Sequence, residues 1–562
     1  MPPKVYIDSK FDVILDHLIK RDFERVNSIE ECTNDIDLIW TNLRNITWNS
    51  IMNQTVNHLK GSHHLSNKSF LAYHLHSSAR DSMMPLQWSA AYQDLGELIS
   101  MALYCDLYRL ALRIQNNTLW GTLSRQIVDT YMKKYERLVA VLRLDTDWVS
   151  STYATLIDAL TLVLQQYVDG NNDASTAIAS LLSEHKETQH FDPMYLDVRH
   201  KNDGNDSDTQ PIPEESVWIV KPVGSSCGAG ISLCRGLKAL LDSVTQVGYK
   251  CVVQKYIERP LLVRDRRKFD IRQWILVTSA NDPLEVYGCS EFYCRLSKTS
   301  YTTNDDQLSD IFVHLCNHAI QEKKEEEVDQ TGSKEVDHDT SNYGNRHDDG
   351  DIPSPPLCDS MMSHLEFERE LIAQGHPPNT VNTVIVPQIQ AISLHMLSCV
   401  RDKLQKVGNG FEWLGLDLVV TEDLQVKLIE CNVSPDVSRS TPVTSRLVEQ
   451  GVVSLLPLLL DGDEKTSSVR DESVCWQPWS LSESTVASSV PSSSDKAVEL
   501  SALSVLQFAN AKRRHRILGT DYAPRKKELV ERCQIVLKQV EKSMHIENER
   551  GELEEDSDDD EL

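Results

Sequence analysis

Residues 428–435 read LIECNVSP, a short apolar strand that is interrupted by two polar side chains before a proline. Side chains alternate between the two faces of a strand, so Glu430 and Asn432 project from the same face. Both carry oxygen atoms that can bind a hard cation, and both stand near the end of the predicted strand. This stretch therefore predicts a polar site at the edge of an apolar sheet.

The preceding residues extend this strand into a hairpin. Residues 413–428, WLGLDLVVTEDLQVKL, have the pattern of a strand, a turn at 421–425 and a second strand. Antiparallel pairing then brings Asp417 roughly opposite Glu430. Three oxygen donors in one place cost free energy unless a cation neutralises them, and Mg²⁺ prefers such ligands. We therefore predict a magnesium site at Asp417, Glu430 and Asn432.

Length and charge set limits on the kind of protein. The chain has 562 residues, enough for two or three domains, and its ten tryptophans and 40% of apolar residues are typical of a globular protein. The net charge of −27 is concentrated in 322–351, with 11 acidic and 4 basic residues, and in 551–562, with 8 acidic residues. We expect both stretches to be disordered. The remaining body is mildly acidic, which argues against a nucleic-acid-binding protein.

Cysteine spacing and hydropathy indicate the compartment. The thirteen cysteines include no C-x-x-C pair and no zinc-finger spacing. The N-terminal MPPKVYIDSK lacks the apolar core of a signal peptide, so the C-terminal DDEL is not expected to act as an ER-retrieval signal. The longest apolar run, at 451–460, is about half a membrane span and contains a proline. We expect a cytoplasmic protein with reduced thiols and no membrane segment.

The pattern of apolar residues predicts an α/β fold. Helical periodicity dominates the N-terminal part, most clearly at 101–117 and 149–168, and a further helical stretch at 381–407 leads into the hairpin. From residue 216 the chain changes to short β-rich runs, after a polar linker at 201–215. The expected regions are a mainly helical N-terminal region at 1–200, a core at 216–460 with an acidic disordered insert at 322–360, a Ser-rich linker at 461–500, a basic helical segment at 501–550 and an acidic tail at 551–562.

A glycine-rich loop follows the first β-rich run of the core. Residues 221–231 read KPVGSSCGAGI, and such a loop can close its amide groups around phosphate oxygens while Lys221 supplies positive charge. The stretch is neither a Walker loop nor a dinucleotide-binding fingerprint. A flexible hairpin turn explains it equally well when it is taken alone.

Two further β-rich runs carry polar side chains. Residues 252–262, VVQKYIERPLL, predict either a core strand with a polar exit or a strand whose backbone at Gln254–Ile257 binds an adenine rim. In 266–274, RRKFDIRQW, Phe269 and Ile271 share one face. The opposite face carries Lys268, Asp270 and Arg272. Two cations around one carboxylate suit an anionic ligand, although ordinary salt bridges on a solvated face explain them too.

The remaining candidates are isolated polar residues in apolar surroundings. Arg295 lies in FYCRLS, and FVHLCNHAIQ at 312–321 contains His314, Asn317 and His318, which are equally consistent with hydrogen-bonded core groups. The order of the segments is more informative than any one of them. A basic glycine-rich hairpin, an adenine-type strand, a Lys/Asp/Arg strand and a metal hairpin are the parts that an ATP-dependent carboxylate–amine ligase needs.

Several motifs resemble those of the tubulin–tyrosine ligase-like proteins, which have an ATP-grasp catalytic core with mixed and antiparallel sheets. The motifs are QKYIERPLL, KFDIRQW, HLCNHAIQ, DLVV…LIECNVSP and STPVTSRL. They are most similar to the glycylase branch of that family. The resemblance is dense over 216–322 and 375–460, and it extends weakly to 54–75, which is similar to the family's N-terminal domain.

The resemblance implies a role for each candidate residue. ATP would be held by Lys221, Cys227, Gly228, Ala229, Gly230, Ile231, Gln254, Lys255, Tyr256, Ile257, Lys268 and Asp270. Magnesium would be bound by Asp417, Glu430 and Asn432. Arg272 would stabilise the transferring phosphoryl group and the acyl-phosphate, and Arg295, with Cys316 and Asn317, would hold the incoming amino acid by its carboxylate.

Two departures from the family pattern remove cations. Much of the family has basic residues between the lysine and the glycines of the loop, whereas Val223–Cys227 has none here. A basic residue usually found five positions before Arg295 is Ser290 in this chain. A weakly active or inactive protein is therefore one of the interpretations that the sequence leaves open.

The implied reaction activates a glutamate side chain of an acidic tubulin tail with ATP and joins it to the amine of glycine. The alternatives are glutamate as the donor, which would make the protein a polyglutamylase, and a catalytically inactive microtubule-binding protein. The basic segment at 511–545 would attract an acidic microtubule surface, although a solvated helix or a nuclear-localisation-like run explains it too. We expect the cytoplasm and cytoskeleton, including the axoneme of cilia, as the location.

Overall fold

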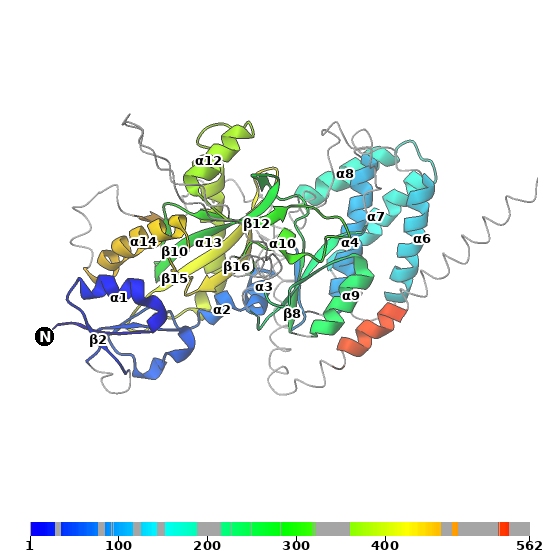
Figure 1. Cartoon of the computed structure of the whole chain (residues 1–562). Helices are drawn as coiled ribbons and strands as arrows, with labels where there is room; N and C mark the ends of the chain where they lie inside the picture. The colour runs from blue at the N-terminus through cyan, green and yellow to red at the C-terminus, as the bar shows by residue number, and fades with distance from the viewer. Residues whose placement is uncertain are drawn as a thin grey trace, which may run out of the picture.

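The computed structural model describes residues 2–28, 35–76, 85–115 except 92 and 94, 125–142, 152–187, 215–320 except 226, 227, 249, 281, 282, 318 and 319, 360–461, 475–480, 527 and 529–538. Within these ranges the strands form three sheets. Figure 1 shows the N-terminal sheet on one side, the long strands β10 and β15 in the centre, and a group of helices on the other side.

The largest sheet is built around β10 (Arg267–Ser279), which pairs antiparallel with every neighbour that the structure describes. Its other strands are β9 (Leu262–Val263), β11 (Glu285–Cys289), β12 (Tyr293–Ser300), β13 (Met361–Ser363), β15 (Glu412–Val420), β16 (Val426–Val433) and β17 (Trp476–Trp479). The predicted hairpin is confirmed as β15 and β16, and the turn lies at 421–425.

Helices cover both faces of this sheet. On one face, α13 (Val386–Val400) and α12 (His364–Ala373) bury apolar side chains against Phe269 and Ile271. On the other face, α14 (Pro442–Leu460) packs with Trp274 and Trp413. This alternation along β10 is the pattern predicted for 266–274, in which Phe269 and Ile271 point into the core.

A small parallel sheet joins the N-terminus to the centre. Its strand order is β14-β4-β3-β1-β2, and all four pairings are parallel. The strands are β1 (Lys4–Ile7), β2 (Glu24–Val26), β3 (Leu38–Trp40), β4 (Thr55–Val56) and β14 (Asn409–Gly410). Helix α1 (Asp12–Ile19) buries Ile14 and Leu18 in the apolar cluster that also contains α14. Two short helices, α2 (His63–Ser66) and α3 (Lys68–His76), then lead toward the third sheet.

The third sheet has the order β5-β8-β6-β7 and is antiparallel. Its strands are β5 (Gln87–Ser89), β6 (Val217–Pro222), β7 (Ser232–Arg235) and β8 (Cys251–Lys255). An apolar cluster joins this sheet to α4 (Leu95–Gln115), α6 (Arg125–Leu142), α7 (Thr152–Val168), α8 (Ala174–Glu187) and α9 (Gly236–Val247). Residues 529–538 are helical and place Cys533 and Leu537 in the same cluster, beside α9 in Figure 1.

The mixed α/β class is confirmed, and so are the helices expected at 101–117, 149–168 and 381–407. The described residues of 1–200 are mainly helical. Within this region the first 56 residues contribute four strands to a parallel sheet, because their short apolar runs pair with each other and with β14. Strand β5 belongs to the sheet of β6–β8, so the N-terminal region also supplies a strand to the sheet that follows it in the sequence.

Residues 201–214 of the linker predicted at 201–215, residues 322–359 of the insert predicted at 322–360 and the whole acidic tail lie outside the described residues. The same is true of most of the Ser-rich linker and of the basic segment before residue 527.

Two helical stretches, Val381–Lys403 and Pro442–Leu460, pass a test of length and apolar composition for crossing a membrane. A core helix of a soluble protein passes the same test. Both stretches contribute side chains to the apolar clusters on the large sheet, among them Ile389 and Leu455.

Candidate functional site

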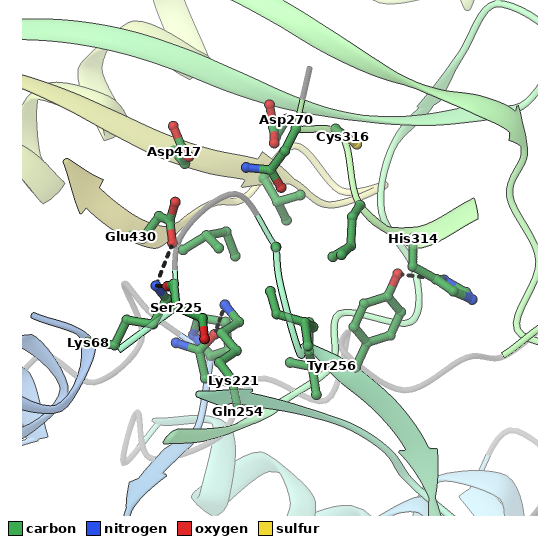
Figure 2. A pocket seen from close by; sticks show the side chains of 18 of the residues that line it. Lys68, Lys221, Ser225, Gln254, Tyr256, Asp270, His314, Cys316, Asp417 and Glu430 are labelled. Carbon is green, nitrogen blue, oxygen red and sulfur yellow. Dashed lines mark hydrogen bonds and ion pairs between the residues drawn. The ribbon is translucent and has the colours of Figure 1, made fainter. Parts of the chain in front are cut away.

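A cavity of about 340 Å³ lies between the third sheet and the β15–β16 hairpin. Most of the predicted site residues line it: Lys221, Gly228, Ala229, Ile231, Gln254, Lys255, Tyr256, Ile257, Lys268, Asp270, Cys316, Asn317, Asp417, Glu430 and Asn432. Figure 2 shows side chains from the two sheets facing each other across this space. Segments that are separate in the sequence therefore converge on one site.

Three of the predicted residues that the structure describes do not line the cavity. Gly230 lies beside Pro222 in the glycine loop, where a Cβ would come within 3.1 Å of the proline ring. Arg272 and Arg295 are buried behind the carboxylates that face the cavity. Cys227 lies outside the described residues.

The hairpin brings the predicted metal ligands together. Asp417 and Glu430 are direct cross-strand partners, as predicted. The amide nitrogen of Asn432 lies 3.4 Å from both Asp417 Oδ2 and Glu430 Oε1. A register shift directly after Asp417 pairs Leu418 with Leu428 and leaves Ile429 as an extra residue. This bulge explains why Ile429 and Glu430 both line the cavity, which strict alternation does not allow.

Two arginines neutralise the carboxylates behind the cavity. Arg272 donates from Nε to Asp417 Oδ1 at 2.5 Å, and Arg295 Nη2 lies 2.9 Å from Asp417 Oδ2. Arg295 also binds Asp270 through two hydrogen bonds, of 2.6 and 2.8 Å. Burial opposes ionisation of Asp417, but the two guanidinium groups outweigh it and hold the Asp417 pKa well below its usual range. Burial raises the pKa of Asp270 despite its pairing with Arg295, so within this paired network Asp417 is the carboxyl group that the arginines hold most firmly in its charged form.

Lys221 is the cation that the third sheet supplies. Its amine donates to Gln254 Oε1 at 2.6 Å, and Gln254 is in turn held by Gln87 of β5. Burial lowers the pKa of Lys221 to about 8, against the attraction of Glu430. An anionic ligand in the cavity would restore the charged form of this amine.

Lys268 lies on the opposite wall. Its amine donates to the Tyr256 hydroxyl at 3.1 Å and to the His314 carbonyl at 2.8 Å. The Tyr256 hydroxyl and His314 Nδ1 are 3.0 Å apart. Burial, followed by repulsion from Lys268, lowers the pKa of His314 to about 4, so this imidazole is neutral near pH 7. His314 therefore orients Lys268 and Tyr256 and is a hydrogen-bonded core group, one of the alternatives that the sequence left open.

The glycine loop needs its glycines for two reasons. Gly228 and Gly230 have φ of +73° and +71°, a conformation that side chains disfavour. A Cβ on Gly228 would lie 2.2 Å from Ile320 Cδ1, so the backbone passes close to the residues that follow α10 (Ile311–His314). The loop can thus approach a ligand with its backbone.

Strand β8 presents its backbone to the cavity, while one of its side chains has a structural role. Lys255 is fully buried, and its amine lies 2.5 Å from Glu258 Oε1, which also accepts from Arg109 of α4. Burial disfavours the Glu258 carboxylate, but these two cations outweigh it and lower its pKa to about 2. The Lys255 amine is therefore directed at a buried ion-pair network.

Sequence reasoning missed Lys68, the first residue of α3. Its amine lies 3.2 Å from the Ser225 carbonyl in the glycine loop and 3.7 Å from Glu430 Oε2 (Figure 2). The weak resemblance of 54–75 to a family N-terminal domain was the signal that could have found it.

Gly415 was missed as well. A Cβ there would lie 3.2 Å from Arg272 Cδ, and a glycine inside an apolar strand indicates such a close approach.

Ser290 lies apart from the cavity lining. It follows β11, is exposed, and donates its amide to the Cys475 carbonyl at 2.7 Å. The cation that the family usually carries at this position would therefore extend from the end of β11.

The residues present fit a magnesium nucleotide. Apolar side chains that suit a purine line one part of the cavity: Ile219, Ile231, Ile257, Leu315 and Val419. Lysine amines line the part next to the carboxylates. Among the described residues no group of three His, Cys, Asp or Glu side chains is placed to hold a metal, so a magnesium site here depends on the Asn432 amide. That amide would have to turn its oxygen toward the ion.

Comparisons with known proteins identify the family of the chain. The model of the tubulin-tyrosine ligase family matches residues 151–351 and 355–467. Tubulin glycylase 3D of Tetrahymena thermophila is 34% identical over 250 residues, 44% of this chain and 21% of that protein.

Two mammalian relatives match to a similar extent. Tubulin monoglycylase TTLL3 of Homo sapiens is 36% identical over 255 residues, 44% of this chain and 29% of the relative. Protein monoglycylase TTLL8 of Mus musculus is 32% identical over 252 residues, 44% of this chain and 27% of the relative. The match spans less than a third of each of these relatives. The family model covers more than half of this chain, which belongs to the tubulin-tyrosine ligase family.

Proposed function

We propose that this chain is an ATP- and Mg²⁺-dependent ligase with an ATP-grasp core, which adds glycine to glutamate side chains of tubulin tails. The observation that carries the proposal is the single cavity in which Lys221 and Lys268 face Asp417, Glu430 and Asn432. The names of the relatives, tubulin glycylase and monoglycylase, support the substrate and the donor. Partners are microtubules and free glycine, and the proposed location is the cytoplasm and cytoskeleton, including the axoneme.

When bound, the magnesium nucleotide supplies the phosphoryl group that activates a glutamate carboxylate for attack by the amine. The apolar wall would hold the base, and the backbone of Gln254–Ile257 and of the glycine loop would follow the nucleotide. Lys221 and Lys268 are buried cations directed at the same space and would neutralise phosphate oxygens. Asp417, Glu430 and Asn432 would hold the metal.

Arg272 and Arg295 supply positive charge next to the carboxylates of the proposed reaction centre. Arg272 and Arg295 already bind Asp417 and Asp270, so their positions are fixed before any substrate arrives. Cations fixed in this way stabilise negative charge that develops on transferring oxygens, because they need no reorganisation. In this proposal Arg295 holds the donor carboxylate together with Cys316 and Asn317, which line the cavity; because Arg295 lies behind the lining and is paired with Asp270 and Asp417, its guanidinium would have to turn toward the cavity.

The missing cations of the glycine loop have a partial replacement. Val223–Cys227 carries no basic residue, but Lys68 reaches the Ser225 carbonyl from α3. A positive charge therefore lies next to the loop although the loop itself has none. This contact favours an active ligase over an inactive microtubule-binding protein.

The test is incubation of the purified chain with microtubules, ATP, Mg²⁺ and either glycine or glutamate, followed by intact mass spectrometry of the tubulin tails. Glycine-sized additions that disappear in Glu430→Gln are expected. Glutamate-sized additions would identify a polyglutamylase. Microtubule binding without any addition would identify the inactive protein and make Ser290 the first position to restore to a basic residue.

A further inference from the structure

A buried polar network connects the N-terminal sheet to the end of the metal hairpin. Its centre is the pair of His58 and Glu412, both with no exposed surface, in which His58 Nδ1 lies 2.6 Å from Glu412 Oε1. The other ring nitrogen, Nε2, lies 3.0 Å from the Thr41 carbonyl and 3.1 Å from the Ser434 hydroxyl. The Thr41 carbonyl oxygen can only accept from the ring, whereas the Ser434 hydroxyl can donate or accept.

Glu412 is held from the same side by the segment that follows His58. Its Oε2 accepts from the Leu59 amide at 2.9 Å and from the Ser62 hydroxyl. One buried carboxylate therefore fixes the loop that leads into α2, and Lys68 begins the next helix. The network sets the position from which Lys68 enters the cavity.

Ser434 connects the network to the hairpin. It directly follows β16, two residues after Asn432, and its φ of +53° lies in the left-handed region that a non-glycine residue adopts at a cost. Its hydroxyl is bound to His58 Nε2, which fixes the hairpin end at this strained turn. Loss of a residue that orients a metal ligand commonly lowers metal affinity 10- to 100-fold.

We propose that His58, Glu412 and Ser434 are positioning residues. They hold the C-terminal end of β16 and the start of α3 in the positions that binding of the magnesium nucleotide requires. The proposal rests on the proposed function, because it assigns Glu430 and Asn432 to the metal. It predicts that N-terminal residues more than 350 positions away in the sequence control binding at the hairpin.

The experiment compares Ser434→Ala with Ser438→Ala, a control that removes a hydroxyl from the exposed loop just beyond, where it binds Asp436. A second variant, Ser434→Gly, removes the hydroxyl and relieves the strained φ, so it guards against a folding defect. Two quantities are measured in the full chain: ATP affinity by calorimetry, with Mg²⁺ and with EDTA, and hydrogen–deuterium exchange of 430–434 without ligand.

Both Ser434 variants are expected to bind Mg²⁺·ATP about tenfold more weakly, with little change in EDTA, and to exchange faster at 430–434. Ser438→Ala should match the unmodified chain in both measurements. Exchange and Mg²⁺·ATP affinity equal to those of Ser438→Ala would overturn the proposal. Failure of the unmodified chain to bind nucleotide would instead refute the proposed function, and the exchange data would still decide whether Ser434 holds the hairpin.

Discussion

The amine of Lys68 lies 3.7 Å from the carboxylate of Glu430, and this contact joins α3 to the β15–β16 hairpin. The same amine contacts the Ser225 carbonyl of the glycine loop at 3.2 Å. Three chain segments therefore meet at one cation. Its side chain is 18% exposed, so it can shift toward a ligand without breaking a buried network.

Replacement of Lys68 by Met is expected to weaken ATP binding roughly 10- to 100-fold, because a charge-assisted hydrogen bond contributes about 1.5–3 kcal/mol. The measurement is calorimetric titration with Mg²⁺·ATP. Lys60→Met removes an exposed lysine from the same N-terminal region and is the matched control. Equal affinities for the two variants would show that Lys68 does not contact the nucleotide.

The two carboxylates of the hairpin should respond differently to loss of charge. Asp417 is ion-paired to both arginines at 2% exposure, so Asp417→Asn leaves the buried Arg272 without its carboxylate, although Arg295 keeps Asp270, and should cost about 3–5 kcal/mol of stability. Glu430 is 24% exposed, and its carboxylate lies 3.7 Å from the Lys68 amine and 3.4 Å from the Asn432 amide nitrogen, so Glu430→Gln should leave stability nearly unchanged. Both variants should lose ligation. Urea unfolding, run beside the ligation assay, separates the two effects, and equal destabilisation would contradict this account of the cluster.

The hairpin and the alternation of β10 could be predicted because both depend on local patterns. A period of two and a short polar turn bring Asp417 roughly opposite Glu430 and direct Lys268 and Asp270 away from Phe269. The direct pairing of Asp417 with Glu430 depends on a bulge, because an unbroken ladder would pair Asp417 with Ile429. The bulge at Ile429 could not be predicted, since one extra residue in a strand leaves no mark in a pattern of apolar and polar letters.

The contacts that bring distant parts of the chain to the site could not be predicted from the sequence either. Lys68 reaches the cavity from an N-terminal segment whose strand β4 pairs with β14, a pairing between segments far apart in the chain. Likewise, no local sequence pattern distinguishes Lys255 from Lys221. The Lys255 amine pairs with the buried Glu258, whereas the Lys221 amine donates to Gln254 at the cavity. The direction of a lysine side chain is set by tertiary contacts.

The pKa of Lys221 predicts a pH dependence of nucleotide binding. Burial lowers this pKa to about 8, so in the free protein the amine loses its proton as the pH rises through 8. Phosphate oxygens favour the charged form, and binding above pH 8 then requires proton uptake. ATP affinity should fall by up to about tenfold per pH unit above that value. Lys221→Arg stays charged and should show a flatter profile between pH 7 and 9.5, whereas identical slopes would assign the effect to another group.

Burial of Asp106 in α4 is expected to make the free energy of unfolding depend on pH. The carboxylate is 3% exposed and accepts from the Ser216 amide at 2.8 Å. Burial, followed by repulsion from Glu215, raises its pKa to about 6. A folded-state pKa above the unfolded value means that the stabilisation of the protonated form is complete below about pH 4 and is lost as the pH rises through 6.

Asp106→Asn removes the charge and keeps an acceptor for the Ser216 amide, while Arg109 retains its contact with Glu258. The stability advantage of the variant over the unmodified chain should therefore grow by about 1–1.5 kcal/mol between pH 5 and pH 7.5. Urea unfolding of both proteins at the two pH values measures this difference, because the other titrating groups are common to both and cancel. A difference in unfolding free energy that does not change with pH would mean that Asp106 is ionised in the folded protein at pH 5 as well as at pH 7.5.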